Sequence, residues 1–284
     1  MKRGSHACPA SDPQGRRSGR VLTSLEGKAA LPLAVDPGTG RLEFRGGLPP
    51  VTPAVRTLAE MREVLEDPAA SGPDELYYMY RDVGFPQDRE RLHAHGLRYD
   101  ITVILPVRVG REFAKTAGHY HPDVPGANLP YPEIYEVLHG TAWYLLQRRS
   151  GDGVSDVVLV KATPGDKVLI PPGYGHITIN PGPDVLVMSN LVEKDFRSLY
   201  EPYRLRRGGA YYCVTGDGGE PRFVPNPLYG AVPSLRVVSA APQPDLGLDP
   251  AVPLYRAAAA DPSRYAYLVR PQERGEALMR GVAG

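Results

Sequence analysis

Three histidines and one glutamate have the residue types and spacing to bind a metal ion. His119 and His121 are two residues apart, so on a β-strand both imidazoles point to the same face, whereas on a helix they would diverge. Glu133 and His176 follow farther along the chain. Neutral imidazoles and a carboxylate suit a borderline divalent ion such as Fe, Mn, Ni or Zn, and they leave coordination positions open for substrate oxygens. We therefore expect one divalent ion, without a choice among these metals.

Two other histidine positions have less support. His93 and His95 are also two residues apart, but charged residues precede them and no partner carboxylate follows at a suitable interval. We expect them to lie in a solvated loop. His139 directly precedes Gly140, which indicates a turn, and it is left without a role.

The residues around the expected ligands resemble the two motifs of the cupin superfamily, G-x5-H-x-H-x3/4-E-x6-G and G-x5-P-x-G-x2-H-x3-N. The second motif is matched at every fixed position, by Gly165, Pro171, Gly173, His176 and Asn180.

The first cupin motif is matched with two departures. It is carried by His119, His121, Glu133 and Gly140, but Phe113 stands where a glycine leads the motif, and eleven residues separate His121 from Glu133. Those eleven residues, 122–132, are rich in Pro and Gly, so we expect them to loop out between two strands. Glu136 is a rival carboxylate, but only Glu133 keeps the six-residue spacing to Gly140, and strand alternation places Glu136 on the opposite face.

Within this superfamily the chain is most similar to the cupin-type glucose-6-phosphate isomerases. The likeness spans roughly residues 99–200, and its matching pieces are Val109–Phe113, Thr116–His121, Glu133–Tyr135 and Leu145–Gln147. It implies an all-β cupin, which is a double-stranded β-helix or jelly-roll barrel, and a homodimer.

The resemblance also implies a reaction, the aldose–ketose isomerisation of glucose 6-phosphate and fructose 6-phosphate. The metal would bind the oxygens on C1 and C2, polarise the carbonyl and stabilise an enediolate. Glu133 would then move the proton between C2 and C1. A metal-assisted hydride shift is the competing mechanism.

Substrate contacts are carried over from the family in the same way. The resemblance assigns substrate binding to Thr102, Thr116, Gly118 and Tyr200. The resemblance also places Tyr135 among the substrate contacts. Because Tyr135 is two residues from Glu133 and hence on the same strand face, it joins Glu133 as a catalytic candidate. Three cations, Arg108, Arg111 and Lys115, are near enough in sequence to meet a phosphate.

Two alternatives remain open. An Fe-dependent cupin dioxygenase would use the same three histidines and glutamate, although such pockets are usually apolar, whereas Thr102, Thr116 and Tyr135 would make this one polar. An isomerase-like cupin that acts on another sugar phosphate, or that only binds sugar, is the third reading.

The elements that must position these residues are mainly strands. Apolar, β-branched and aromatic runs separated by Gly, Pro and Asp clusters predict an antiparallel β sandwich or barrel. The expected strands are Glu75–Tyr80, Tyr99–Val109, Glu112–His121, Glu133–Gln147, Val154–Lys161, Val168–Ile170, His176–Asn180, Val185–Val192 and Ala210–Val214. A capping box at Thr57–Glu60 predicts one short helix, and a weak helical pattern appears near Leu254–Ala259.

We divide the chain into three parts. Residues 1–20 are expected to be a disordered leader, residues 21–240 a cupin domain with an N-terminal arm and a core at about 99–215, and residues 241–284 a C-terminal extension packed on the outside of the barrel.

Composition narrows the partners and the compartment. A net charge of +1 with mixed acidic and basic residues gives no one-sided field for nucleic acid or a membrane surface. No run of apolar residues has the length of a membrane helix. Only Cys8 and Cys213 are present, so a disulfide framework is not expected and a reducing, cytoplasmic compartment fits best.

Overall fold

The protein folds mainly into β-sheets, as its alternating and β-branched segments predict. The computed structural model describes residues 21–282, so the expected leader lies outside the described residues. In that range all strand pairings are antiparallel except the one between β11 and β17. No helix of the described part is both long and apolar enough to cross a membrane.

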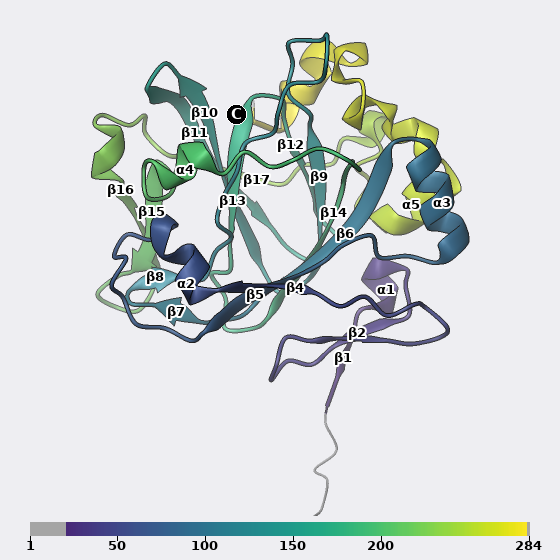
Figure 1. Ribbon diagram of the computed structural model, residues 1–284, viewed down its shortest axis with the longest axis horizontal. Coiled ribbons are helices and arrows are strands. Elements are labelled where there is room, and N and C mark those ends of the chain that lie inside the picture. Colours follow the sequence, from purple (N-terminus) through teal and green to yellow (C-terminus); the bar gives the residue numbers. More distant parts are fainter. Residues whose placement is uncertain (1–20, 283–284) are drawn as a thin grey trace, which may run out of the picture.

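Two larger sheets enclose the interior of the barrel (Figure 1). The six-stranded sheet has the order β12 (Lys167–Ile170), β9 (Glu133–His139), β14 (Leu186–Glu193), β6 (Leu97–Ile104), β5 (Glu75–Tyr80) and β4 (Ala54–Thr57). The four-stranded sheet has the order β13 (Tyr174–Ile179), β10 (Ala142–Ser150), β11 (Gly153–Ala162) and β17 (Arg236–Ser239).

The remaining strands form two smaller sheets. One contains β16 (Pro221–Pro225), β15 (Tyr211–Thr215), β8 (Glu112–Phe113) and β7 (Arg108–Val109). The other contains β1 (Thr23–Ser24), β2 (Leu33–Val35) and β3 (Leu42–Phe44), so part of the expected N-terminal arm is itself a small sheet.

Short helices connect or cover the strands. The α-helices of the described range are α1 (Glu26–Ala29), α2 (Leu58–Met61), α3 (Pro86–Ala94), α4 (Glu201–Arg204) and α5 (Leu254–Ala260). The 3₁₀ turns are Arg62–Val64, Pro227–Tyr229, Pro244–Leu246, Pro262–Leu268, Pro271–Glu273 and Gly275–Val282.

The expected capping box is present at the start of α2. Thr57 accepts a hydrogen bond from the backbone of Glu60, and the Glu60 carboxylate accepts one from the backbone of Thr57. The expectation of a single short helix was wrong, because α3 also forms, with Pro86 in its first turn, where the missing N–H is not needed. His93 lies in this helix and His95 at its end, both solvent-exposed, so the predicted loop was wrong although the predicted exposure was right.

Several strands are shorter than predicted. Strand β6 ends at Ile104, before Pro106, which cannot donate to a ladder. The segment predicted as Glu133–Gln147 divides into β9 and β10 around Gly140, whose φ of +80° makes the turn and where a Cβ would lie 2.7 Å from the backbone oxygen of Val185. Only Glu112–Phe113 of the predicted strand Glu112–His121 is regular.

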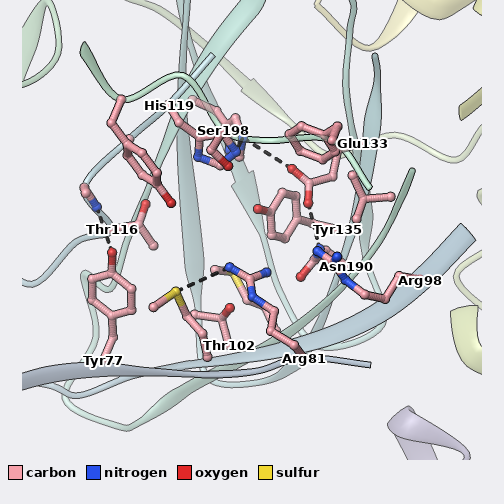
Figure 2. Close-up of a pocket in the computed structure, with 18 residues that line it drawn as sticks. Tyr77, Arg81, Arg98, Thr102, Thr116, His119, Glu133, Tyr135, Asn190 and Ser198 are labelled. Carbon is pink, nitrogen blue, oxygen red and sulfur yellow. Dashed lines mark hydrogen bonds and ion pairs between the residues drawn. The ribbon is translucent and has the colours of Figure 1, made fainter. Parts of the chain in front are cut away.

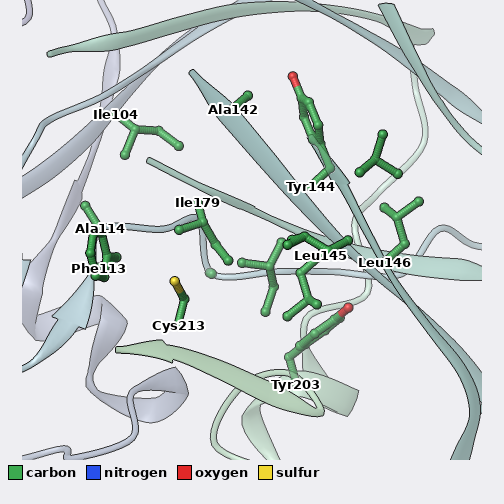
Figure 3. Close-up of a cluster of buried hydrophobic side chains, with 14 of the residues drawn as sticks. Ile104, Phe113, Ala114, Ala142, Tyr144, Leu145, Leu146, Ile179, Tyr203 and Cys213 are labelled. Carbon is green, nitrogen blue, oxygen red and sulfur yellow. The ribbon is translucent and has the colours of Figure 1, made fainter. Parts of the chain in front are cut away.

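The six-stranded sheet is buried on both faces. Its inner face packs against the other large sheet in one core, which includes Val137, Tyr144, Leu146 and Met188 (Figure 3 shows part of this core). Its outer face contributes Ile134, Leu138, Tyr99 and Ile101 to a second core. That core also contains residues of the arm and of the chain after residue 240, such as Leu33, Leu254 and Tyr267. Helix α5 lies beside α3 (Figure 1). Domain boundaries at residues 20 and 240 stay predictions.

Candidate metal centre and pocket

Three segments bring the four expected ligands together. His119 and His121 lie in the extended stretch between β8 and β9, Glu133 is the first residue of β9, and His176 lies in β13. The backbones of His119 and His176 pair directly, since the N–H of each donates to the oxygen of the other. The residues 122–132 form turns with a small bridge between Asp123 and Pro130, so this insertion loops out and returns Glu133 to the site as expected.

The ligand atoms converge on one point. Nε2 of His176 is 3.3 Å from Nε2 of His119 and 3.3 Å from Nε2 of His121. Oε2 of Glu133 is 3.3 Å from His121 Nε2 and 3.4 Å from His176 Nε2. Ligands held about 2.0–2.1 Å from one ion lie roughly 3.0–3.4 Å apart. All four ligand atoms lie within 4.8 Å of one another, which is the spacing of a single metal site.

The charge state of the cluster also suits a metal ion. Burial, together with the neighbouring His176 and His121, holds the pKa of His119 well below its ordinary value, and burial lowers the pKa of His176. Burial alone would raise the pKa of Glu133, but its interactions with His121 and His176 outweigh it and hold that pKa well below the usual range. Within residues 21–282, the Oε2 atom of Glu133 is buried without a hydrogen-bond donor. A buried carboxylate that faces imidazole nitrogens is an arrangement that a divalent cation would complete.

Outer partners fix two of the ligands. Nδ1 of His121 donates to the backbone oxygen of Tyr131, 2.6 Å away, which leaves Nε2 free to face the ion. Asn190 donates from Nδ2 to Oε1 of Glu133 at 2.7 Å, which leaves Oε2 for the ion. The sequence reasoning missed Asn190, although its alternation with Met188 and Val192 in a buried strand could have placed it on the inner face.

A polar pocket of about 200 Å³ opens beside the cluster (Figure 2). Its walls include His119, Glu133 and His176 and each of the other residues assigned from the resemblance, which are Thr102, Thr116, Gly118, Tyr135 and Tyr200. Tyr77, Met79, Arg81, Arg98, Ala117, Met188, Asn190, Val192, Phe196 and Ser198 line it as well, and none of these was expected.

Gly118 must be a glycine at its place in the wall. Its φ is +76°, and a Cβ there would lie 2.6 Å from Cγ1 of Ile177 and 3.1 Å from the ring of Tyr203. The backbone can therefore turn tightly just before His119. Tyr135 is buried, and burial together with Glu133 raises its pKa well above the ordinary value, so its phenol stays protonated.

The three cations expected near the pocket do not line it. Lys115 is buried in an ion pair with Glu112, and the guanidinium of Arg108 lies 3.4 Å from the ring centroid of Phe113. Arg111 pairs with Glu66 at the surface. Proximity in sequence misplaced them, because these residues border the strand pair β7–β8 and face a different part of the molecule.

The barrel, the second motif around His176 and the four converging side chains together define a cupin with a cluster that could hold one metal ion. The family follows from a comparison of sequences. A family model described as "Glucose-6-phosphate isomerase (GPI)" matches residues 55–226, which is more than half of the chain, and the protein belongs to this family in its cupin form.

Curated relatives of the chain are named glucose-6-phosphate isomerases. The glucose-6-phosphate isomerase of Thermococcus gammatolerans is 31% identical over 188 residues, which cover 65% of this chain and 91% of the relative. That of Thermococcus onnurineus is 32% identical over 135 residues, covering 48% of this chain and 66% of the relative, and that of Pyrococcus furiosus is 31% identical over 133 residues, covering 47% and 65%.

Solved structures resemble the chain more distantly. Oxalate decarboxylase from Lactobacillus farciminis is 15% identical with a TM-score of 0.32 and covers 45% of this chain and 32% of its own. A cupin domain of an XRE family transcriptional regulator from Enterobacter cloacae is 12% identical with a TM-score of 0.27 and covers 41% of this chain and 94% of its own. At these scores the likeness carries no argument about function.

Proposed function

We propose that this protein is a metal-dependent isomerase that interconverts glucose 6-phosphate and fructose 6-phosphate. The observation that carries the proposal is the convergence of His119, His121, Glu133 and His176 in the wall of a polar pocket, in a chain of the glucose-6-phosphate isomerase family. One divalent ion, Fe, Mn, Ni or Zn, would occupy that cluster. When bound, it polarises the substrate carbonyl and offsets negative charge that develops in the reaction.

The side chains of the pocket supply the remaining chemistry. Glu133 accepts a proton from one substrate carbon at Oε1 and returns it to the next, while Asn190 holds that oxygen in place. Tyr135 keeps its own proton and donates a hydrogen bond to a substrate oxygen. The wall formed by Thr102, Thr116, Gly118 and Tyr200 orients the sugar phosphate.

The polar lining argues against a dioxygenase that takes aromatic or thiol substrates. Thr102, Thr116, Arg81, Arg98 and Asn190 present hydroxyl, guanidinium and amide groups to the pocket. An apolar substrate would cover the donors of Arg81 that face the pocket without pairing them. An anionic, hydroxyl-rich substrate satisfies them.

The test is a coupled assay that follows conversion of fructose 6-phosphate to glucose 6-phosphate, with metal-stripped protein and with protein reconstituted with each candidate ion. We expect activity to be lost on stripping and regained with at least one divalent ion. Oxygen consumption on a flavonol or thiol substrate, with no isomerisation by any reconstituted form, would contradict the proposal and favour a dioxygenase.

We also propose that the protein is a homodimer in the cytoplasm. We further propose that a cupin domain spans residues 21–240 and that a C-terminal extension spans residues 241–284. The family resemblance supports the dimer, and the packing of Leu254 and Tyr267 on the outer face of the six-stranded sheet supports the extension. Light scattering of the purified full chain measures the mass that decides between monomer and dimer.

A further inference from the structure

Two arginines are the cations of the pocket. Arg81 directly follows β5 and Arg98 lies in β6, and both side chains line the pocket that contains Glu133 and His119. Figure 2 shows Arg81 beside Thr102, on the side of the pocket opposite His119 and Ser198.

A buried carboxylate holds both arginines. The side chain of Asp100 is only 1% exposed. Arg81 donates from Nη1 to its Oδ2 at 2.7 Å, and Arg98 donates from Nε to Oδ1 and from Nη2 to Oδ2 at 2.9 and 3.0 Å. Two guanidinium groups thus share one carboxylate, and the three side chains of Arg81, Arg98 and Asp100 together carry one net positive charge.

The register of the sheet places this cluster in line with the metal ligands. Asn190 pairs across the strands with Asp100 on one side and with Tyr135 on the other, and Arg81 continues the row beyond Asp100. Asn190 also donates to Glu133. A row across β9, β14 and β6, continued by the residue that follows β5, therefore connects the cationic end of the pocket to the ligand cluster.

The two arginines differ in the donors that they keep free. All three nitrogens of Arg98 are used, because its Nη1 donates to the backbone oxygen of Lys194. In Arg81 the partner of Nη2 is the thioether sulfur of Met79 at 3.5 Å, which is a weak acceptor, and within residues 21–282 its Nε has no hydrogen-bond partner. The side chain of Arg81 is 45% exposed, so these donors are accessible from the pocket.

The backbone next to Arg81 is fixed in an uncommon conformation. Asp82 has a φ of +56°, and its N–H donates to Oδ1 of Asp100 at 2.8 Å. A non-glycine residue in this region is strained and persists where its surroundings hold it there. Asp100 therefore fixes both the guanidinium of Arg81 and the chain direction that aims it.

We propose that Arg81 binds the phosphate group of the substrate, with Asp100 and Arg98 as its positioning residues. The inference deepens the proposed function and rests on it. A phosphate monoester carries about −1.5 to −2 charges at pH 7 and accepts several hydrogen bonds, which the free Nε–H and Nη–H groups of a fixed guanidinium match. The substrate then spans the pocket, with its reacting carbons at the ligand cluster and its phosphate at the opposite side.

Kinetics of Arg81→Gln test the proposal, with Arg222→Gln as the matched control. Arg222 is exposed in β16 and lies outside the pocket, and its replacement by glutamine removes the same charge. We expect Arg81→Gln to raise the KM for fructose 6-phosphate by about 10- to 100-fold, since it removes charge-assisted hydrogen bonds. Turnover of unphosphorylated fructose should not change, and Arg81→Lys should lie between the wild type and the glutamine variant. Arg222→Gln should match the wild type.

A direct titration separates this inference from the proposed function. Inorganic phosphate is titrated calorimetrically into metal-loaded wild type, Arg81→Gln, Arg81→Lys and Arg222→Gln, each first checked by its melting temperature. We expect phosphate binding to weaken at least about 10-fold in Arg81→Gln and not in Arg222→Gln. A wild type that binds phosphate through Arg81 but does not isomerise fructose 6-phosphate would refute the function and keep the anion site.

Three results would overturn the role of Arg81. One is equal phosphate affinity in Arg81→Gln and Arg222→Gln, and another is no phosphate binding by the wild type. The third is an equal loss of activity towards fructose 6-phosphate and unphosphorylated fructose, which would place Arg81 at the reacting carbons.

Discussion

The two faces of strand β9 carry two buried glutamates in opposite surroundings. On the outer face Glu136 pairs with Lys167 at 2.7 Å and accepts a hydrogen bond from the backbone of Leu254 at 2.8 Å, and Lys167 donates to the backbone oxygen of Asp249 at 2.9 Å. On the inner face Glu133 lies against the imidazoles of His121 and His176, and in the described part of the chain its Oε2 has no hydrogen-bond donor.

The comparison separates a carboxylate that stabilises the fold through an ion pair from a carboxylate that faces the pocket. The outer carboxylate finds its cation within the chain, and the pair attaches the segment at 249–254 to the barrel. The inner carboxylate meets imidazole nitrogens that point to a common centre, and this group could hold one metal ion. Changes at the inner face should therefore alter chemistry, and changes at the outer face should alter stability.

The largest effect should come from Glu133→Gln. It preserves the shape of the side chain but removes the base, so we expect kcat to fall about 10³-fold in protein reloaded with metal. The matched variant Glu136→Gln, where it folds, should keep kcat within about 3-fold of the wild type, because it does not touch the pocket. The coupled isomerase assay with metal content measured on the same samples checks both. Near-normal turnover in metal-loaded Glu133→Gln would remove Glu133 as the base.

The next effect is on stability at the outer face. Glu136→Leu leaves the ammonium of Lys167 buried without its carboxylate, which should lower the free energy of unfolding by about 3–5 kcal/mol. The double variant Glu136→Leu with Lys167→Met should recover much of that loss, because it removes both charges at similar volume. Urea unfolding of the metal-loaded proteins measures both. A double variant no more stable than the single one would show that the backbone contacts to Leu254 and Asp249 dominate.

The sequence predicted the convergence of His119, His121, Glu133 and His176 better than it predicted the rest of the pocket lining. His119, His121 and His176 sit in motifs whose spacing and turn glycines are local, so their convergence could be anticipated from the chain. Glu136 was also placed correctly on the face opposite Glu133, because alternation along a strand is local as well.

Arg81, Arg98 and Asn190 show why the rest could not be predicted. They line the pocket because β5, β6 and β14 pair in one register, and strand order and register are long-range properties. For the same reason, proximity in sequence suggested that Arg108, Arg111 and Lys115 could meet a substrate phosphate, but none of the three lines the pocket. The helix α3 was missed because its charged surface has no apolar periodicity beyond the buried Leu92.

A smaller effect on the inner face should follow from Asn190→Ala. The amide holds Oε1 of Glu133 at 2.7 Å and so leaves Oε2 to the ion. Loss of an outer partner of this kind lowers metal affinity or activity by about 10- to 100-fold. Competition with a chelator measures the affinity, and Ser155→Ala, on the exposed strand end far from the ligands, serves as the control. An unchanged affinity and an unchanged kcat would show that the histidines alone position Glu133.

The smallest effect is a difference in how the two faces respond to pH. In metal-stripped protein His119 and His176 stay neutral in the fold because burial lowers their pKa values, whereas the unfolded chain protonates them below about pH 6.5. Stability should therefore fall as pH drops below 6.5, by up to about 1.4 kcal/mol per pH unit for each histidine. Glu136 acts in the opposite sense, since burial raises its pKa and its contribution falls as pH rises above 4.5.

Urea unfolding of metal-stripped protein between pH 5.5 and 7.5 measures this slope. Replacing His119 and His176 by glutamine should reduce it, while replacing the exposed His95 should not. A divalent ion binds the folded chain and not the unfolded one, so loading the wild type with metal should add stability across this pH range. A slope that is the same in the double variant and in the wild type would assign the acid sensitivity to groups outside the inner cluster.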